Sequence, residues 1–194
     1  MASELQVTTL RGNPTGANAN QVLVPSGQTL HAPGMPLQIV NAEKLNTAAT
    51  NSGMGTGWVD TGLSCAITPK FNNSKILVHA DYAGGVTTAA FNYFRVVRSI
   101  GGGSYSMISE ADTPGSRNAI HGMVYDADNQ GQVCLQTFNH LDSPATTNAV
   151  TYKLQFATGG GGGYVYIGQS NRDTNSADAD PRAASRIILQ EIAQ

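Results

Sequence analysis

The chain has 194 residues, a formal net charge of −2 and only 12% charged residues, against about 25% in typical soluble domains. A nucleic-acid-binding domain needs clustered basic residues, a membrane helix needs roughly 20 apolar residues, and a secretory signal needs an apolar segment at the N-terminus. The sequence has none of these, so we expect no nucleic-acid partner, no membrane span and no secretion by the general route. The length suits one domain with an appended arm. The 22 glycines and the Thr/Ser/Asn-rich background suit all-β proteins that are crowded into assemblies.

Residues 1–36 differ from the rest of the chain because glycine and proline recur throughout them. Proline cannot donate to a sheet ladder and glycine weakens strand interiors, so this segment cannot form a central sheet. We predict an extended docking arm with two short edge strands, at residues 7–10 and 22–24. The apolar side chains of the arm need cover from its own domain or from another chain, and we expect these to dock: Leu5, Val7, Leu10, Val22, Leu23 and Val24.

Residues 37–194 are predicted to form the folded domain, and residues 58–82 are its most regular unit. They contain two predicted strands joined by a polar turn. The second strand alternates with a period of two, which is typical of a half-buried strand, and it places on one face Ile76, Val78, Ala80 and Tyr82. Trp58 is the only tryptophan and opens the unit, so we expect it to anchor the core.

Short strands separated by turn signals continue along the chain. We expect residues 46–57 to form a loop and Gly84-Gly85 to break the chain. The closing strand, residues 185–192, is almost continuously apolar, which indicates that both its faces, including Ile188, are covered, either by the core or by a neighbouring subunit. The other predicted strands are residues 37–44, 92–98, 105–108, 120–125, 132–138, 150–156 and 164–167. This pattern predicts an all-β fold, an antiparallel β-sandwich of the jelly-roll type.

No catalytic group of residues stands out in the sequence, so we expect no enzyme. The histidines are His31, His79, His121 and His140. No nucleophile elbow of the G-x-S-x-G type accompanies them. His79 lies on the polar face of its predicted strand, which favours a surface or interface position over a role as a base.

Two acidic segments deserve comparison with calcium loops. Residues 126–131 begin like an EF-hand, but Thr137 stands where the pattern needs a bidentate glutamate, so a hairpin turn is the favoured interpretation. Asp173, Asp178 and Asp180 lie in a second segment, which we interpret as a solvated loop, with a weak calcium site as the alternative. We therefore expect no cofactor and metal-independent folding.

The remaining signals favour structural roles. Gly159 to Gly163 lack the Lys-Ser/Thr and the helix of a phosphate-binding loop, and a strand is predicted to follow. Tyr164 and Tyr166 fit sheet packing, with a sugar-stacking surface as the alternative. The two cysteines lie in separate predicted strands, so we expect small buried side chains rather than a disulfide: Cys65 and Cys134.

Five segments of the sequence resemble small virion proteins of tailed bacteriophages, especially phages of cyanobacteria and other aquatic hosts. They are V-T-T-L-R-G, V-P-S-G-Q-T-L-H-A-P-G-M, G-W-V-D-T-G-L-S-C-A-I-T-P, N-S-K-I-L-V and I-I-L-Q-E-I. The resemblance runs from the N-terminal arm to the last strand. It implies a β-sandwich that associates as a homotrimer, and it carries no catalytic residues.

On this basis we expect a non-enzymatic structural component of a virion, a capsid decoration (cement) or short head-fibre protein. Its partners would be copies of itself and other virion proteins such as the major capsid protein. The alternative is a tail-fibre tip that binds a host surface glycan through its loops. A small glycan hydrolase ranks third, because it needs two carboxylates at a defined separation, which a sequence cannot show.

Overall fold

In the part of the chain that the structure describes, the regular secondary structure consists of β-strands and includes no helix. The computed structural model describes residues 15–16, 21, 24, 26, 28–55, 57–87, 90–125, 131–159 and 163–194. It divides into two units, Met1–His31 and Ala32–Gln194. Among the described residues, no helix is long and apolar enough to cross a membrane. The strands, all in the second unit, are β1 (Pro36–Lys44), β2 (Ala48–Thr50), β3 (Val59–Ile67), β4 (Lys75–Val86), β5 (Phe91–Ile100), β6 (Ser106–Met107), β7 (Gly122–Tyr125), β8 (Cys134–Asp142), β9 (Val150–Gly159), β10 (Val165–Ile167) and β11 (Ser185–Ile192).

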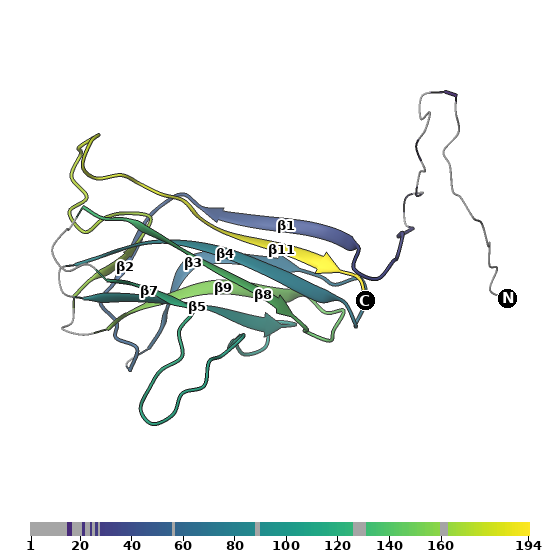
Figure 1. Ribbon diagram of the computed structural model, residues 1–194, viewed down its shortest axis with the longest axis horizontal. Helices are drawn as coiled ribbons and strands as arrows, with labels where there is room; N and C mark the ends of the chain where they lie inside the picture. The colour runs from purple at the N-terminus through teal and green to yellow at the C-terminus, as the bar shows by residue number, and fades with distance from the viewer. Residues whose placement is uncertain are drawn as a thin grey trace. The chain divides into compact units, whose positions relative to one another are not determined.

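The strands form two antiparallel sheets that pack face to face (Figure 1). The six-stranded sheet has the order β1-β11-β4-β10-β2, with β8 also paired to β4, and the five-stranded sheet has the order β3-β9-β5-β6, with β7 also paired to β5. Without the short β2, β6 and β10, the two paths are β1-β11-β4-β8 and β3-β9-β5-β7. Two four-stranded sheets connected in this way form the double Greek key of a jelly roll. The predicted fold class is therefore confirmed.

The strand register defines two poles of the sandwich. Pro36 pairs with Ile192, the backbone N–H of Gly34 donates to the carbonyl of Ala193 (2.8 Å), and the Ala193 N–H donates to the carbonyl of Met35 (2.9 Å). The start of β1 and the end of β11 therefore share a terminal pole. The connections β1–β3, β4–β5, β7–β8 and β9–β11 join strand ends at the opposite pole, which we call the loop pole (Figure 1).

The core lies between the sheets and consists of the inward-facing side chains of both. The predicted apolar face of β4 is confirmed, because Ile76, Val78, Ala80 and Tyr82 are all fully buried. The Tyr82 ring stacks on Phe94 of the opposite sheet with 4.9 Å between ring centres. Burying each large side chain of this kind stabilises the fold by about 1.5–3 kcal/mol.

Gly84 and Gly85 do not break the chain as predicted, since β4 continues through them to Val86. A Cβ on Gly84 would lie 2.6 Å from the Tyr82 ring, and one on Gly85 would lie 2.2 Å from the carbonyl oxygen of Gln169. Both glycines therefore permit close packing within a strand.

The two faces of the closing strand differ in burial. Ile187 and Leu189 are fully buried, whereas Ile188 is only partly buried. Ile188 points to the outer face of the six-stranded sheet, opposite Asn41 of β1 and His79 of β4. Within the described residues of the single chain that face is not covered, so the core covers only one face of the strand, and cover of Ile188 by a neighbouring subunit stays a prediction.

The predictions for Trp58 and for residues 46–57 are wrong. Trp58 lies just before β3 and is only partly buried, and the Arg95 guanidinium lies 4.5 Å from its ring centre. Tyrosine and phenylalanine fill the core in its place. The predicted loop contains β2, which pairs with β10 at the edge of the six-stranded sheet.

Candidate functional site

The predicted docking residues lie almost entirely outside the described part of the chain. Leu5, Val7, Leu10, Val22 and Leu23 are outside it, as are the segments 126–130 and 160–162. Val24 is described, and 44% of its surface is exposed in the single chain. Docking by the arm, and the turn at Asp126 and Asp128, therefore stay predictions.

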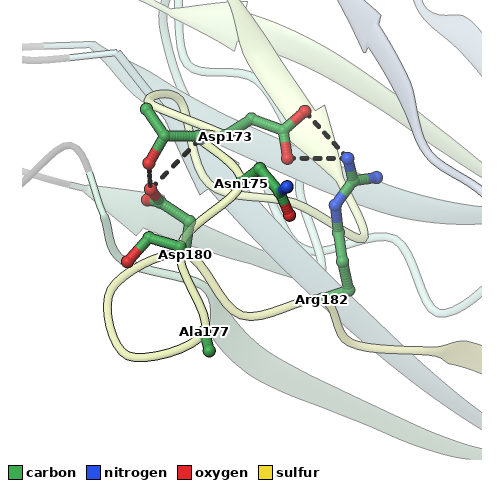
Figure 2. A pocket seen from close by; sticks show the side chains of 7 residues that line it. Asp173, Asn175, Ala177, Asp180 and Arg182 are labelled. Atoms are coloured by element: carbon green, nitrogen blue, oxygen red, sulfur yellow. Dashed lines mark hydrogen bonds and ion pairs between the residues drawn. The ribbon is translucent and has the colours of Figure 1, made fainter.

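The acidic segment 173–182 lies between β10 and β11 and surrounds a depression of about 390 Å³. Figure 2 shows that its two inner carboxylates have separate partners. Asp180 is buried and accepts hydrogen bonds from the Ser170 hydroxyl (3.0 Å), from Arg172 Nε (3.0 and 3.1 Å) and from the backbone N–H and hydroxyl of Thr174. Asp180 therefore ties the segment together, in contrast to the solvated loop that was predicted.

Two of the three carboxylates of this segment are paired with arginines, Asp180 with Arg172 and Asp173 with Arg182. The hydrogen bond from Arg172, aided by Thr174, lowers the pKa of Asp180 to about 2. Asp173 pairs with Arg182 through both carboxylate oxygens (2.7 and 2.8 Å), and Asp178 is exposed. Among the described residues there is no group of three metal-ligating side chains. The arrangement fits a folded surface loop better than the alternative of a calcium site.

Two histidines have well-defined surroundings. His79 lies on the outer face of the six-stranded sheet, where its Nδ1 is 2.5 Å from Asn139 Oδ1 and its Nε2 is 3.3 Å from Asp81, as expected for a surface residue. His121 accepts a hydrogen bond from the Val96 N–H through Nδ1 (2.9 Å) and donates from Nε2 to the carbonyl of Ile108 (2.8 Å). Both ring nitrogens of His121 are thus hydrogen-bonded to backbone groups, one as acceptor and one as donor, which requires the neutral ring.

The stability of the fold is expected to fall as the pH drops from about 6.5 to about 4, because His121 must stay neutral. Burial lowers the pKa of His121 to about 4, while hydrogen bonds to the carbonyls of Ile108 and Ser109 oppose the shift, and the nearby His140 and Arg95 add to it. The unfolded chain binds a proton in this range and the folded chain does not, so folding loses on the order of 1–2 kcal/mol. Urea unfolding at pH 7, 5.5 and 4.5 measures the loss. The His121→Gln variant should lack this component, and an equal pH slope in that variant would contradict the assignment.

The outer face of the five-stranded sheet carries a set of contacts that the sequence did not reveal. We call its members the aromatic–polar strip: Trp58, Asp60, Arg95, Tyr105, Lys153 and Gln155. Arg95 Nε donates to Gln155 Oε1 (2.9 Å), and Gln155 Nε2 donates to Asp60 Oδ1 (2.6 Å). Lys153 Nζ donates to the other carboxylate oxygen of Asp60 (2.5 Å). The strip thus connects three strands, β3, β5 and β9, with Trp58 just before β3 and Tyr105 just before β6.

A depression of about 200 Å³ opens beside this strip. Its walls are Asp60, Gly62, Leu63, Ser64, Tyr105 and Lys153. Lys153 Nζ lies 3.7 Å from the centre of the exposed Tyr105 ring. Gly62 has a φ of +85° and falls where the register between β3 and β9 shifts, and bulges of this kind often occur beside functional sites. The only sequence signal for the depression was the glycine inside an otherwise regular strand pattern.

Tyr164 and Tyr166 lie near the loop pole, with 6.4 Å between their ring centres. Tyr166 belongs to β10 and its hydroxyl donates to Asn171 Oδ1 (2.8 Å), which agrees with a packing role, while Tyr164 is 49% exposed. Cys65 of β3 is buried, as predicted, whereas Cys134 of β8 is only partly buried. The two cysteines lie in strands of different sheets.

No protein-family model matches the chain, and a search of curated proteins found no match. Among solved structures, the chain is similar to a chain of infectious bursal disease virus, Gx strain, at a TM-score of 0.43 and 10% identity over 93% of this chain and 43% of that one. It is also similar to a chain of the VP2 subviral particle of infectious bursal disease virus (TM-score 0.43, 10% identity, 90% and 46% covered). A third similar chain comes from T=1 particles derived from infectious bursal virus (TM-score 0.40, 10% identity, 92% and 42% covered). The present chain therefore spans less than half the length of each of these chains from virus or subviral particles.

Proposed function

We propose that the chain is a non-enzymatic structural component of a tailed-phage virion, a trimeric capsid decoration or short head-fibre protein. Residues 1–36 dock on other virion proteins, such as the major capsid protein, and the jelly roll projects from the particle surface. The protein is located in the virion, and it acts through its surfaces.

The separation of the two poles carries this proposal. The docking segment leads into β1 at the terminal pole, where Gly34 and Met35 are bonded to Ala193. The far ends of β1, β4, β7 and β9 lie at the loop pole (Figure 1). An anchor at one pole leaves the other pole free to project, which suits a protein that decorates a surface.

Two further observations support the proposal. Three of the segments that resemble phage virion proteins fall in β3, β4 and β11, so the resemblance rests on framework strands of the jelly roll. His121 and Asp180, two titratable residues that the sequence singled out, both have structural roles. His121 is hydrogen-bonded to two backbone groups, and Asp180 is hydrogen-bonded to residues of its own loop. Both facts agree with a structural role.

The test removes residues 1–31, which leaves the contacts of Gly34 and Met35 with Ala193 intact. The truncated chain is expected to keep its thermal transition and to lose attachment to phage particles, as seen by imaging and by protein quantification of purified particles. A full-length variant with Leu5→Ser, Val7→Ser and Leu10→Ser should lose attachment in the same way.

Mass measurement in solution at micromolar concentration tests the oligomer separately. The full-length chain is expected to have the mass of a trimer. Wild-type occupancy of particles by the truncated chain would overturn docking by the arm, and a monomeric mass of the full-length chain would overturn the trimer.

A further inference from the structure

We propose that the outer face of the five-stranded sheet binds carbohydrate, with one pyranose ring seated in the depression between Tyr105 and Asp60. This site is independent of the proposed virion role. It is placed on a sheet face, whereas the alternative considered from the sequence put glycan binding in the loops.

The first argument is the pre-orientation of the polar groups. On an exposed sheet face, long side chains usually extend into water and change rotamers freely. Here Asp60 is held by Lys153 and Gln155, and Gln155 is held in turn by Arg95. Arg95 is fixed over the ring of Trp58. A site whose groups are already held by neighbours loses little entropy when a ligand binds.

The second argument is the combination of chemistries around the depression. A pyranose presents an apolar C–H face and a rim of hydroxyls, so it needs an aromatic surface beside charged hydrogen-bonding groups. Tyr105 is 43% exposed and offers an aromatic ring, and Asp60 offers a carboxylate whose side chain is 50% exposed. Lys153 and Ser64 add donors on the same wall. Hydrogen bonds to charged groups of this kind are about twice as strong as neutral ones.

The third argument is the charge state and the size. Burial raises the pKa of Asp60, but hydrogen bonds from Lys153 and Gln155 and the charges of Lys153 and Arg95 outweigh it, so the pKa lies below its ordinary value. The carboxylate is therefore an ionised acceptor at neutral pH. A depression of about 200 Å³ is smaller than the 300 Å³ or more, roughly, of sites for drug-sized ligands, which suits a single sugar ring.

Charge also argues against other ligands. A phosphate or nucleic-acid backbone would find the Lys153 ammonium already paired with Asp60. A divalent cation would find one carboxylate, with a lysine bound to it. The mixed donors and acceptors fit hydroxyl groups, which both donate and accept.

The experiment uses the full-length chain and the fluorescence of Trp58, the only tryptophan and a member of the strip. The probes are hexasaccharides of glucose, galactose, mannose and N-acetylglucosamine, and a hyaluronate hexasaccharide. At least one probe is expected to change the emission in a saturable manner, and calorimetry should give the same affinity. If no probe binds, the proposal is overturned.

Variants then place the bound sugar. Tyr105→Ala and Asp60→Asn, both at exposed positions, are each expected to weaken binding about tenfold or more, with unchanged thermal transitions. Tyr164→Ala is the matched control, because it removes a tyrosine of similar exposure at the loop pole, and it should bind as the wild type does. Wild-type affinity of both strip variants, or loss of binding only in Tyr164→Ala, would overturn the site. An emission change that depends on the protein concentration and not on the sugar concentration would identify the face as a contact between copies of the chain. That result would also overturn the sugar site.

Discussion

Replacement of Asp142 with alanine is expected to reduce the free energy of unfolding by about 3–5 kcal/mol. Asp142 ends β8 in the six-stranded sheet and is buried. Arg98 of β5 donates to both of its carboxylate oxygens (2.7 and 2.8 Å), and the hydroxyl of the fully buried Tyr152 of β9 donates to one of them (2.7 Å). The carboxylate thus joins the two sheets, and its removal leaves the partly buried Arg98 guanidinium and the buried Tyr152 hydroxyl without this partner.

Urea unfolding at one fixed protein concentration measures this effect. Asp173→Ala is the matched control, because it breaks an arginine–aspartate pair that is more exposed, with side-chain exposures of 54% for Arg182 and 29% for Asp173. Such pairs contribute at most about 1 kcal/mol. Tyr152→Phe completes a double-mutant cycle with Asp142→Ala, and the two losses should not add, since both variants break the same hydrogen bond. Additive losses, or an Asp142→Ala cost no larger than that of the control, would contradict the buried network.

Side-chain alternation was sufficient to predict most of the framework. The predicted alternation in β4 and β9 is present, since Val78 and Leu154 are fully buried and lie on inward faces. Boundaries were less certain: β8 was predicted to end at Phe138 and in fact continues to Asp142. A strand pattern weakens where polar residues turn inward, and β8 places His140 and Asp142 on its inner side.

Networks across the sheets could not be predicted because their members are far apart in the chain. One signal was nevertheless present. Arg98 shares the inward face of its strand with Phe94 and Val96, and an arginine on such a face favours a carboxylate partner even when it is only partly buried. The partner's identity depends on which strands face each other, and this follows only from the three-dimensional topology.

The same limit applies to the aromatic–polar strip. Trp58 was assigned to the core because large aromatic residues usually lie there. Trp58 and Asp60, which is two residues further along, both point outward. There Arg95 of β5 contacts Trp58, and Gln155 of β9 donates to Asp60. Hydrophobicity alone does not tell which face of a strand is inside when the outer face also carries aromatic residues.

The closing strand gives the second large effect. Leu189→Ala is expected to destabilise the fold by about 2–5 kcal/mol, because it leaves a cavity in a fully packed core. Leu189 is fully buried and pairs with Val40 of β1 and Val78 of β4, so three adjacent strands would lose contacts. The measurement is the midpoint of urea unfolding at fixed protein concentration.

Ile188→Ala is the control, because it removes a branched aliphatic side chain from the next position of the same strand. Ile188 lies on the outer face and keeps part of its surface in water, so its truncation should cost about 1 kcal/mol or less. Comparing the losses in the free energy of unfolding of the two variants tests the register of β11. A shift by one residue would exchange the two side chains between core and surface. A larger loss in Ile188→Ala than in Leu189→Ala would contradict this register.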